Sequence, residues 1–455
     1  GKRLRRICWQ GLTMNTPVEP ALPFNDLIDS ARGDPAHQNL GKWLSDIKEK
    51  GRDDFYKLGW PSPKMESWRY TNLNKLAKTR FCLPRNTELD KLPDQNILPI
   101  DAPKIVVING KFKRELSDLS EIGEGVLVNS FQDIRSEQKK LFDNKHYAMP
   151  PKEGLPVAAL NDAILSDALF IEIRAGWKSE VPLHIVLIGC GDHIGFSPRI
   201  FISAGENSQI DILESHAGDT GSTYFSNCVS NIQIESGARL GHYKFQNDTT
   251  TSTHLALTQA CIKTDAVYDN FVMSVGGILS RNEVRSLISA SGVECCINGA
   301  YLGTSNQHID NTTFIEHAAE GSRSREVYKG VLADRAKGVF QGKIFVHPEA
   351  QKTDGYQMNR ALLLSDKAEI DSKPELEIYA DDVRCSHGAT VGELEEEHLF
   401  YLMARGIDAE SARRLLVEAY LGEVIDEIQS QKIREILSKS ASDLLKEKLF
   451  ESSDG

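Results

Sequence analysis

The sequence lacks the long apolar run of a membrane protein. None of its 455 residues belong to a hydrophobic stretch near the roughly 20 residues that cross a bilayer. Hydrophobic residues make up 40% and charged residues 26%, which is typical of a soluble globular protein. We therefore expect no membrane contact, and a core large enough to divide into two or three units.

Positive charge is also scarce. The formal net charge is −12, and residues 393–455 alone hold 15 Asp/Glu against 8 Lys/Arg, a balance of −7. Nucleic-acid binding needs a basic surface that displaces counterions. We therefore expect no nucleic-acid partner.

Signatures of catalysis are missing as well. The sequence holds no Walker A motif, no GxSxG and no HExxH, so we predict no nucleotide hydrolysis and assign no catalytic residue. Gly189, Gly191 and Gly195 follow an apolar strand, but their GxGxxxG spacing departs from the dinucleotide fingerprint. Another strand-like run, FSPRIFISA, stands where the phosphate-binding helix should begin.

The cysteines form no CxxC pair and no disulfide framework. They are scattered over positions 8, 82, 190, 228, 261, 295, 296 and 385, which is typical of reduced, buried thiols in a reducing compartment. Cys295 and Cys296 are adjacent, and neighbours on a strand point to opposite faces. We therefore do not expect these two residues to chelate one metal.

Residues 1–24 are expected to form a leader outside the fold. The first 13 residues, GKRLRRICWQGLT, precede Met14 and are basic. They contain no long apolar region, so they are not a secretory signal. An artefact of the start is the favoured interpretation, and the end of a transit peptide is the alternative.

Residues 25–169 are expected to form an N-terminal helical domain with one β-hairpin. Leu40, Trp43, Leu44 and Ile47 follow helical spacing. KIVVINGKFKRE, residues 104–115, predicts a hairpin around a type I′ Asn-Gly turn. Residues 155–169 predict a further short helix.

Residues 170–392 are expected to form a β-solenoid. Short apolar strands recur, and each ends in a small or acidic turn. The turn residues Gly176, Gly205, Gly237, Asp265 and Gly292 are 29, 32, 28 and 27 residues apart, a spacing that favours one structural unit per repeat. A pair of β-sandwiches is the alternative.

Residues 393–455 are expected to form a C-terminal helical domain. Gly406 ends the first predicted helix and Asp408 caps the second. The second helix is expected to bury a stripe made of Ala412, Leu415, Leu416, Ala419 and Tyr420. An uncovered stripe would suit a partner protein.

The stretch between these two parts carries the candidate metal ligands. Leu376 and Ile378 alternate with polar residues and predict a strand that begins just after Pro374. Asp381 and Asp382 predict a bend, and Cys385 and His387 then share one face of a second strand, about 7 Å apart. Thiolate and imidazole suit soft or borderline metals. The alternative is a packed interior pair.

Two motifs resemble a known family. LEIYADDVRCSHGATVG, followed by HLFYLMARGI, and the run KMESWRYTNLNKL resemble the SufD branch of the SufB/SufD family of iron–sulfur cluster assembly scaffolds. The resemblance implies a right-handed parallel β-helix core flanked by an N-terminal α/β-helical region and a C-terminal α-helical domain. It also implies a non-catalytic scaffold subunit of the SUF system.

The resemblance further implies partners and a site. The β-helix would pair with a SufB paralogue and the C-terminal helices would bind the ATPase SufC, giving a SufBCD complex; a homodimer is possible when the chain is alone. His387, with Cys385 as the weaker candidate, would help to hold a nascent iron–sulfur cluster at the heterodimer interface. We expect a cytoplasmic location, or an organelle stroma if the leader is a transit peptide.

Two other function classes remain open at this point. One is a β-helical carbohydrate-active enzyme, for which Asp381 and Asp382 would supply carboxylates, although adjacent strand residues face opposite ways. The other is a purely structural β-solenoid in which Cys385 and His387 merely pack.

Overall fold

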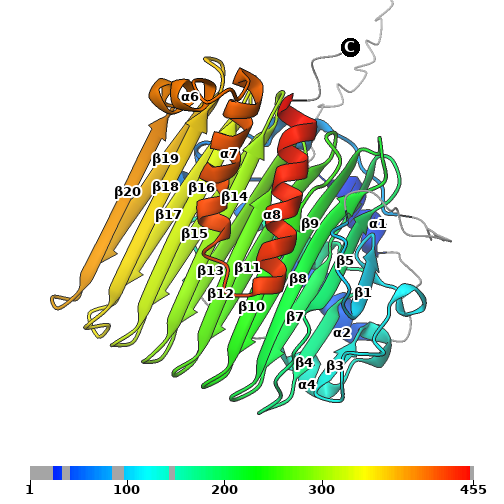
Figure 1. Cartoon of the computed structure of the whole chain (residues 1–455). Helices are drawn as coiled ribbons and strands as arrows, with labels where there is room; N and C mark the ends of the chain where they lie inside the picture. Colours follow the sequence, from blue (N-terminus) through cyan, green and yellow to red (C-terminus); the bar gives the residue numbers. More distant parts are fainter. Residues whose placement is uncertain (1–23, 33–40, 85–96, 143–148, 451–455) are drawn as a thin grey trace, which may run out of the picture.

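The fold is a parallel β-helix with short N-terminal elements and C-terminal helices around it (Figure 1). The computed structural model describes residues 24–32, 41–84, 97–142 and 149–450. Residues 1–23, which hold nearly all of the expected leader, lie outside this part. Successive strands alternate between two ten-stranded sheets and pair in parallel with the strands of the neighbouring coils. The expected β-helix is therefore confirmed, and the β-sandwich alternative is wrong.

The first sheet runs from a short hairpin to the last strand of the chain. In spatial order it contains β2 (Lys111–Phe112), β1 (Lys104–Ile108), β5 (Leu183–Gly189), β8 (Gln209–Gly218), β10 (Arg239–Gln246), β12 (Val267–Ser274), β14 (Glu294–Gly303), β16 (Arg323–Leu332), β18 (Asp354–Leu363) and β20 (Arg384–Gly392).

The second sheet faces the first across the core. In spatial order it contains β19 (Glu369–Ile378), β17 (Lys337–Val346), β15 (His308–His317), β13 (Leu279–Ile288), β11 (Thr253–Ile262), β9 (Tyr224–Ile234), β7 (Arg199–Ala204), β4 (Leu169–Ile173) and β3 (Val126–Asn129), with β6 (Ile194–Phe196) beside β9.

Coil length varies because the turns absorb insertions. The offset between paired strands ranges from 26 residues, between Thr253 and Leu279, to 32 residues, between Lys337 and Glu369. The expected turn residues at 176, 237, 265 and 292 all have positive φ. Gly205 does not, and at that turn Asn207 takes the left-handed conformation, with φ 56°. Gly205 is needed for close packing instead, since a Cβ there would lie 2.6 Å from the backbone nitrogen of Ala175.

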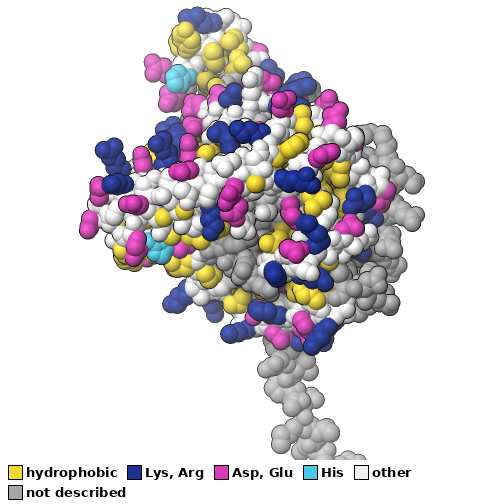
Figure 2. Space-filling view, turned by 90° about the horizontal axis from the view of Figure 1, so that it is seen from below, with side chains coloured by type: hydrophobic (Ala, Val, Ile, Leu, Met, Phe, Trp, Pro, Cys, Tyr) yellow, Lys and Arg dark blue, Asp and Glu magenta, His cyan; other side chains and the backbone are white. Residues whose placement is uncertain are grey.

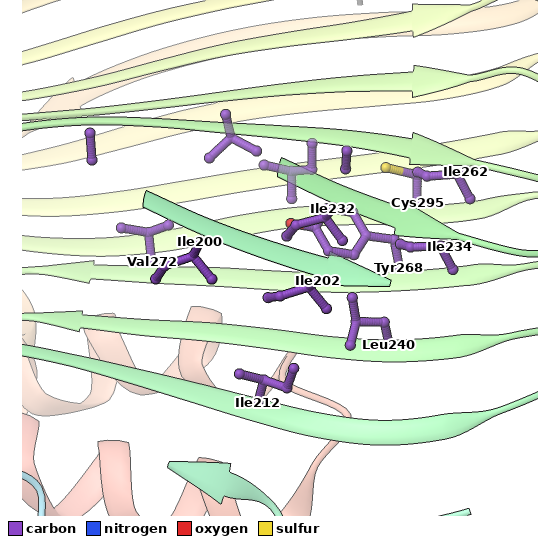
Figure 3. Close-up of a cluster of buried hydrophobic side chains, with 14 of the residues drawn as sticks. Ile200, Ile202, Ile212, Ile232, Ile234, Leu240, Ile262, Tyr268, Val272 and Cys295 are labelled. Carbon is purple, nitrogen blue, oxygen red and sulfur yellow. The ribbon is translucent and has the colours of Figure 1, made fainter. Parts of the chain in front are cut away.

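Apolar side chains from both sheets fill the space between them. Ile200, Ile202, Ile212, Ile232 and Leu240 are among those that meet there (Figure 3), and each is at most 2% exposed. Burial of one such side chain contributes about 1.5–3 kcal/mol. The core therefore runs the length of the β-helix as one continuous column.

The N-terminal part combines helices and the predicted hairpin. Its helical elements are α1 (Asn25–Arg32), α2 (Gly41–Leu58), η2 (Glu66–Trp68), α3 (Asn74–Lys78), η3 (Arg114–Leu116), η4 (Phe131–Asp133), α4 (Ser136–Lys140) and α5 (Pro156–Ala163). Asn109 and Gly110 both have positive φ between β1 and β2, as a type I′ turn requires. The helix predicted for 155–169 ends early, because the Asp167 carboxylate accepts the backbone N–H groups of Phe112 and Phe131.

The C-terminal helices cover one outer face. They are α6 (Glu396–Met403), α7 (Ala409–Ile425) and α8 (Gln431–Leu445), followed by the π-helix η5 (Lys446–Phe450). Figure 1 shows α7 and α8 lying across the outer face of the first sheet. Asp408 caps α7 as predicted, accepting the Ser411 N–H at 2.9 Å.

The buried stripe predicted for α7 is wrong. The face that packs on the sheet is centred on Val417, Leu421 and Val424, while Leu415 is exposed. The helix carries apolar residues on more than one face, so spacing alone did not identify the docked one. No helix of the described segments has both the length and the apolar content to span a membrane.

Candidate metal centre

Cys385 and His387 lie on β20, the last strand of the first sheet, and face the interior of the β-helix. The Cys385 Sγ is 3.2 Å from the position that a Cβ on Gly355 would take, and the side chain packs against the core. His387 is two residues further along the same strand and therefore takes the same face. The predicted strand and the shared face are both found.

His387 is nevertheless exposed. Its neighbour in register on β18, Gln357, is fully buried. The difference arises because no further coil follows β20 and covers its inward side chains. An imidazole that faces inward at an uncovered end can reach a neighbouring chain.

Cys385 is less available than His387. Its side chain is half-buried, and burial raises the pKa of the thiol. Metals bind the thiolate, so a raised pKa weakens this residue as a ligand until a metal or a cation approaches it.

The approach to the site differs in one respect from the expectation. Asp381 and Asp382 form the predicted bend, but β19 begins at Glu369 and not after Pro374. Proline lacks an N–H group and is tolerated only where a strand has no partner on that side. Pro374 fits within β19 because this strand is the free edge of the second sheet.

The residues of this end suit iron in kind but not in number. Iron–sulfur clusters are held by thiolates and imidazoles, usually four in total. Among the described residues, no group of three or more His, Cys, Asp or Glu side chains could hold a metal ion. Cys385 and His387 can therefore supply part of a site, and the remaining ligands would have to come from another molecule.

The surroundings of His387 are an uncovered end of the core. The inward-facing Val391 of β20 is 51% exposed and Ile378 of β19 is 37% exposed. Both strands also leave one backbone edge unpaired within the described sheets. Long free edges beside exposed apolar groups favour pairing with another chain.

Sequence reasoning missed a cluster of buried charged groups deeper in the β-helix. Glu214 accepts from His216 at 3.0 Å and from His242 at 2.8 Å, and Lys244 lies 3.7 Å from it. Burial alone would raise the pKa of Glu214, but Lys244 and the two histidines hold it well below its usual value. Only the 30-residue register between β8 and β10 could have revealed the cluster.

The adjacent cysteines behave as expected. Cys295 is buried in the core of the β-helix, while Cys296 lies on the other face of β14 and is partly exposed. Burial raises the pKa of both thiols, that of Cys296 to about 12. These two residues do not form a chelating pair.

Two family models cover nearly all of the described chain. Residues 187–420 match the model described as "SUF system FeS cluster assembly, SufBD core domain". Residues 24–185 match the SufBD protein N-terminal region. The chain belongs to the SufBD family. Its members are proteins of the SUF system for iron–sulfur cluster assembly, which agrees with the resemblance carried by the two motifs.

Individual SufBD relatives match along most of their length. An iron–sulfur cluster assembly SufBD family protein of Synechocystis is 30% identical over 84% of this chain and 87% of its own. The iron–sulfur cluster assembly protein SufD of Escherichia coli is 27% identical over 83% of this chain and 88% of its own. The chloroplastic protein ABCI7 of Arabidopsis thaliana is 28% identical over 86% and 84%.

Proposed function

We propose that this SufBD protein is a non-catalytic scaffold subunit that pairs with a SufB-type paralogue and binds a SufC-type ATPase. A nascent iron–sulfur cluster, which is the cargo of the complex, would be held at the seam between the two paralogues. The observation that carries this proposal is the position of His387, which faces the interior of the β-helix and yet is exposed at its uncovered end.

Pairing at this end is supported by what the last coil leaves open. The free edges of β19 and β20 offer backbone donors and acceptors to matching strands. A paralogue with the same fold would present an equivalent pair of edges and cover Ile378 and Val391. A second copy of this chain has the same geometry, so a homodimer is the expected form when the paralogue is missing.

The ATPase is assigned to the exposed apolar face of α6. Phe400 is 73% exposed, and Tyr401 and Met403 are also exposed on this short helix. In Figure 1, α6 stands at one end of the sheet, clear of the face covered by α7 and α8. An exposed aromatic cluster of this kind suits a protein partner.

Movement of either partner would change the metal site under this arrangement. A site whose ligands are divided between two subunits is complete only while the subunits are in register. ATP-driven movement of the SufC-type partner could thus open the seam for release. SufD of Escherichia coli and the chloroplastic relative are consistent with a cytoplasmic or stromal location for this chain.

The proposal is tested by replacing His387 in the assembled complex. The His387→Ala chain is expressed with its SufB-type and SufC-type partners, and iron and sulfide are measured in the purified complex. We expect both to fall several-fold while the subunit composition is unchanged. His193→Ala is the matched control, since that histidine is exposed in a distant turn. Full loading of the His387→Ala complex would remove His387 from the mechanism.

A further inference from the structure

Glu326, on β16, is a carboxyl group buried inside the β-helix without a basic partner among the described residues. Thr313 Oγ1 donates to its Oε1 at 2.5 Å and Gln357 Nε2 donates to its Oε2 at 2.8 Å. Burial raises the pKa of this group to about 7. A carboxyl buried in this way is costly to the fold and is therefore a candidate for a function.

Glu326 is aligned with the candidate iron ligand. It is paired in register with Gln357 on β18, which is paired in register with His387 on β20. Neighbouring strands lie about 4.8 Å apart, so each of the three side chains stands beside the next. All three face the interior of the β-helix, and only His387 reaches the open end.

The amide of Gln357 is held in one orientation. Its Nε2 donates to the Glu326 carboxylate, whereas its Oε1 is buried and has no hydrogen-bond partner among the described residues. A flipped amide would place an oxygen against the carboxylate, which has no proton to donate when it is ionised. The free Oε1 therefore stays on the branch of the amide that points away from the carboxylate. A buried acceptor without a partner is costly, and the nearest donor along this row is the imidazole of His387.

We infer that Glu326 and Gln357 are positioning residues for His387. Gln357 Oε1 accepts one N–H group of the imidazole, which fixes the tautomer and leaves the other ring nitrogen free to bind iron. Glu326 acts through Gln357 by preventing the amide from flipping. Ligating histidines generally hold their second N–H group in this way. The iron-binding consequence rests on the proposed function, whereas the hydrogen-bonded row does not.

The row is tested first in the full chain without metal. Histidine labelled with ¹⁵N reports the tautomer of each imidazole, and the signal of His387 is the one that His387→Ala removes. We expect a single tautomer in the wild type. Gln357→Met, which removes the acceptor, should give a mixture of tautomers, and Glu326→Gln, which keeps the volume but permits the flip, should do the same. Asn359→Leu is the matched control on β18 and should leave the signal unchanged, because Asn359 is in register with Ala389.

The second readout is iron in the complex with the SufB-type and SufC-type partners. We expect Gln357→Met to weaken iron retention about tenfold. A wild-type tautomer mixture, or a His387 signal that is the same in Gln357→Met and Glu326→Gln as in the wild type, would overturn the inference. If the tautomer responds but His387→Ala complexes keep their iron and sulfide, the positioning stands and the proposed cluster role fails. The two failures are therefore distinguishable.

Discussion

The guanidinium of Arg281 stacks on the ring of Trp68, with its central carbon 4.1 Å from the ring centroid. Arg281 belongs to β13 and Trp68 to η2, so this contact joins the N-terminal part to the outer face of the second sheet. Both residues are buried, and Arg281 also bonds Asp310 and Glu283. The tryptophan of the KMESWRYTNLNKL run is thus a structural contact between two parts of the chain.

Trp68→Ala should loosen the N-terminal part from the β-helix. The change removes a buried aromatic ring and uncovers a guanidinium, and we expect a loss of about 3–5 kcal/mol in the free energy of unfolding. Urea denaturation measures the loss, and limited proteolysis within residues 24–84 should become faster. Arg69→Ala is the control, because Arg69 is exposed one residue away, and it should change stability by about 0.5 kcal/mol or less. Equal effects of the two variants would contradict this role of Trp68.

Glu214→Gln should destabilise the β-helix strongly. The carboxylate is fully buried and compensates Lys244, which is only 2% exposed. Removal of one partner leaves the other charge unpaired in the core, which costs about 3–5 kcal/mol. The midpoint of urea unfolding at pH 7 measures the change, with Glu206→Gln as an exposed control. A loss below 1 kcal/mol would mean that Lys244 is neutral in the folded protein.

The effect of Glu214→Gln should depend on pH with a defined sign. Because the pKa of Glu214 is lowered in the folded state, its stabilisation is complete above its usual pKa and is lost as pH falls below that value. The stability gap between wild type and variant should therefore be constant above about pH 4.5 and narrow at lower pH. A gap that widens on acidification would contradict the lowered pKa. Burial lowers the pKa of His216 to about 4, so this neighbour stays neutral over most of the range.

Val391→Lys should prevent pairing with the SufB-type partner while leaving the chain folded. Val391 is half-exposed on the terminal strand, so a charge there costs little in the free chain but would be buried in the pair. We expect the Kd for the partner to rise roughly thirtyfold or more, about 2 kcal/mol. Binding is measured by calorimetry or analytical ultracentrifugation. Leu127→Lys, on the exposed side of β3 at the other end, should bind normally.

Phe400→Asp should abolish binding of the SufC-type ATPase alone. The ring is the most exposed large apolar side chain among the described residues, and α6 does not need it for packing. Co-purification of the ATPase should fail, while pairing with the SufB-type partner persists. Val391→Lys should show the reverse pattern, so each variant controls for the other. Loss of both partners from one variant would indicate misfolding or a shared surface.

The parity of the sequence around Cys385 predicted their strand and their shared face correctly. It could not predict that His387 is exposed while Gln357, on the same face one coil earlier, is buried. Exposure depends on whether another coil follows, and a strand pattern reports only the two faces of the strand. For the same reason the alternatives of a packed pair and an accessible ligand stayed open.

Contacts between coils were the other limit. His216, His242 and Glu214 meet because β8 and β10 pair with a 30-residue offset, and the approximate turn spacing of the sequence does not fix that register. The regular turns themselves were predictable from glycine and aspartate, except where Asn207 replaced Gly205 as the left-handed residue. Asparagine tolerates that conformation, so a search for glycine alone passes over it.

The two ends of the β-helix are unequal, and this difference limits growth. At the N-terminal end, β2 and β3 pair antiparallel with their neighbours and turn the sheets back, whereas β19 and β20 stop with bare edges. A molecule with one adhesive end consumes that end when it meets a counterpart, so assembly terminates at two. Chains built from stacked strands risk becoming endless fibres, and here the closed end makes a polymer geometrically impossible.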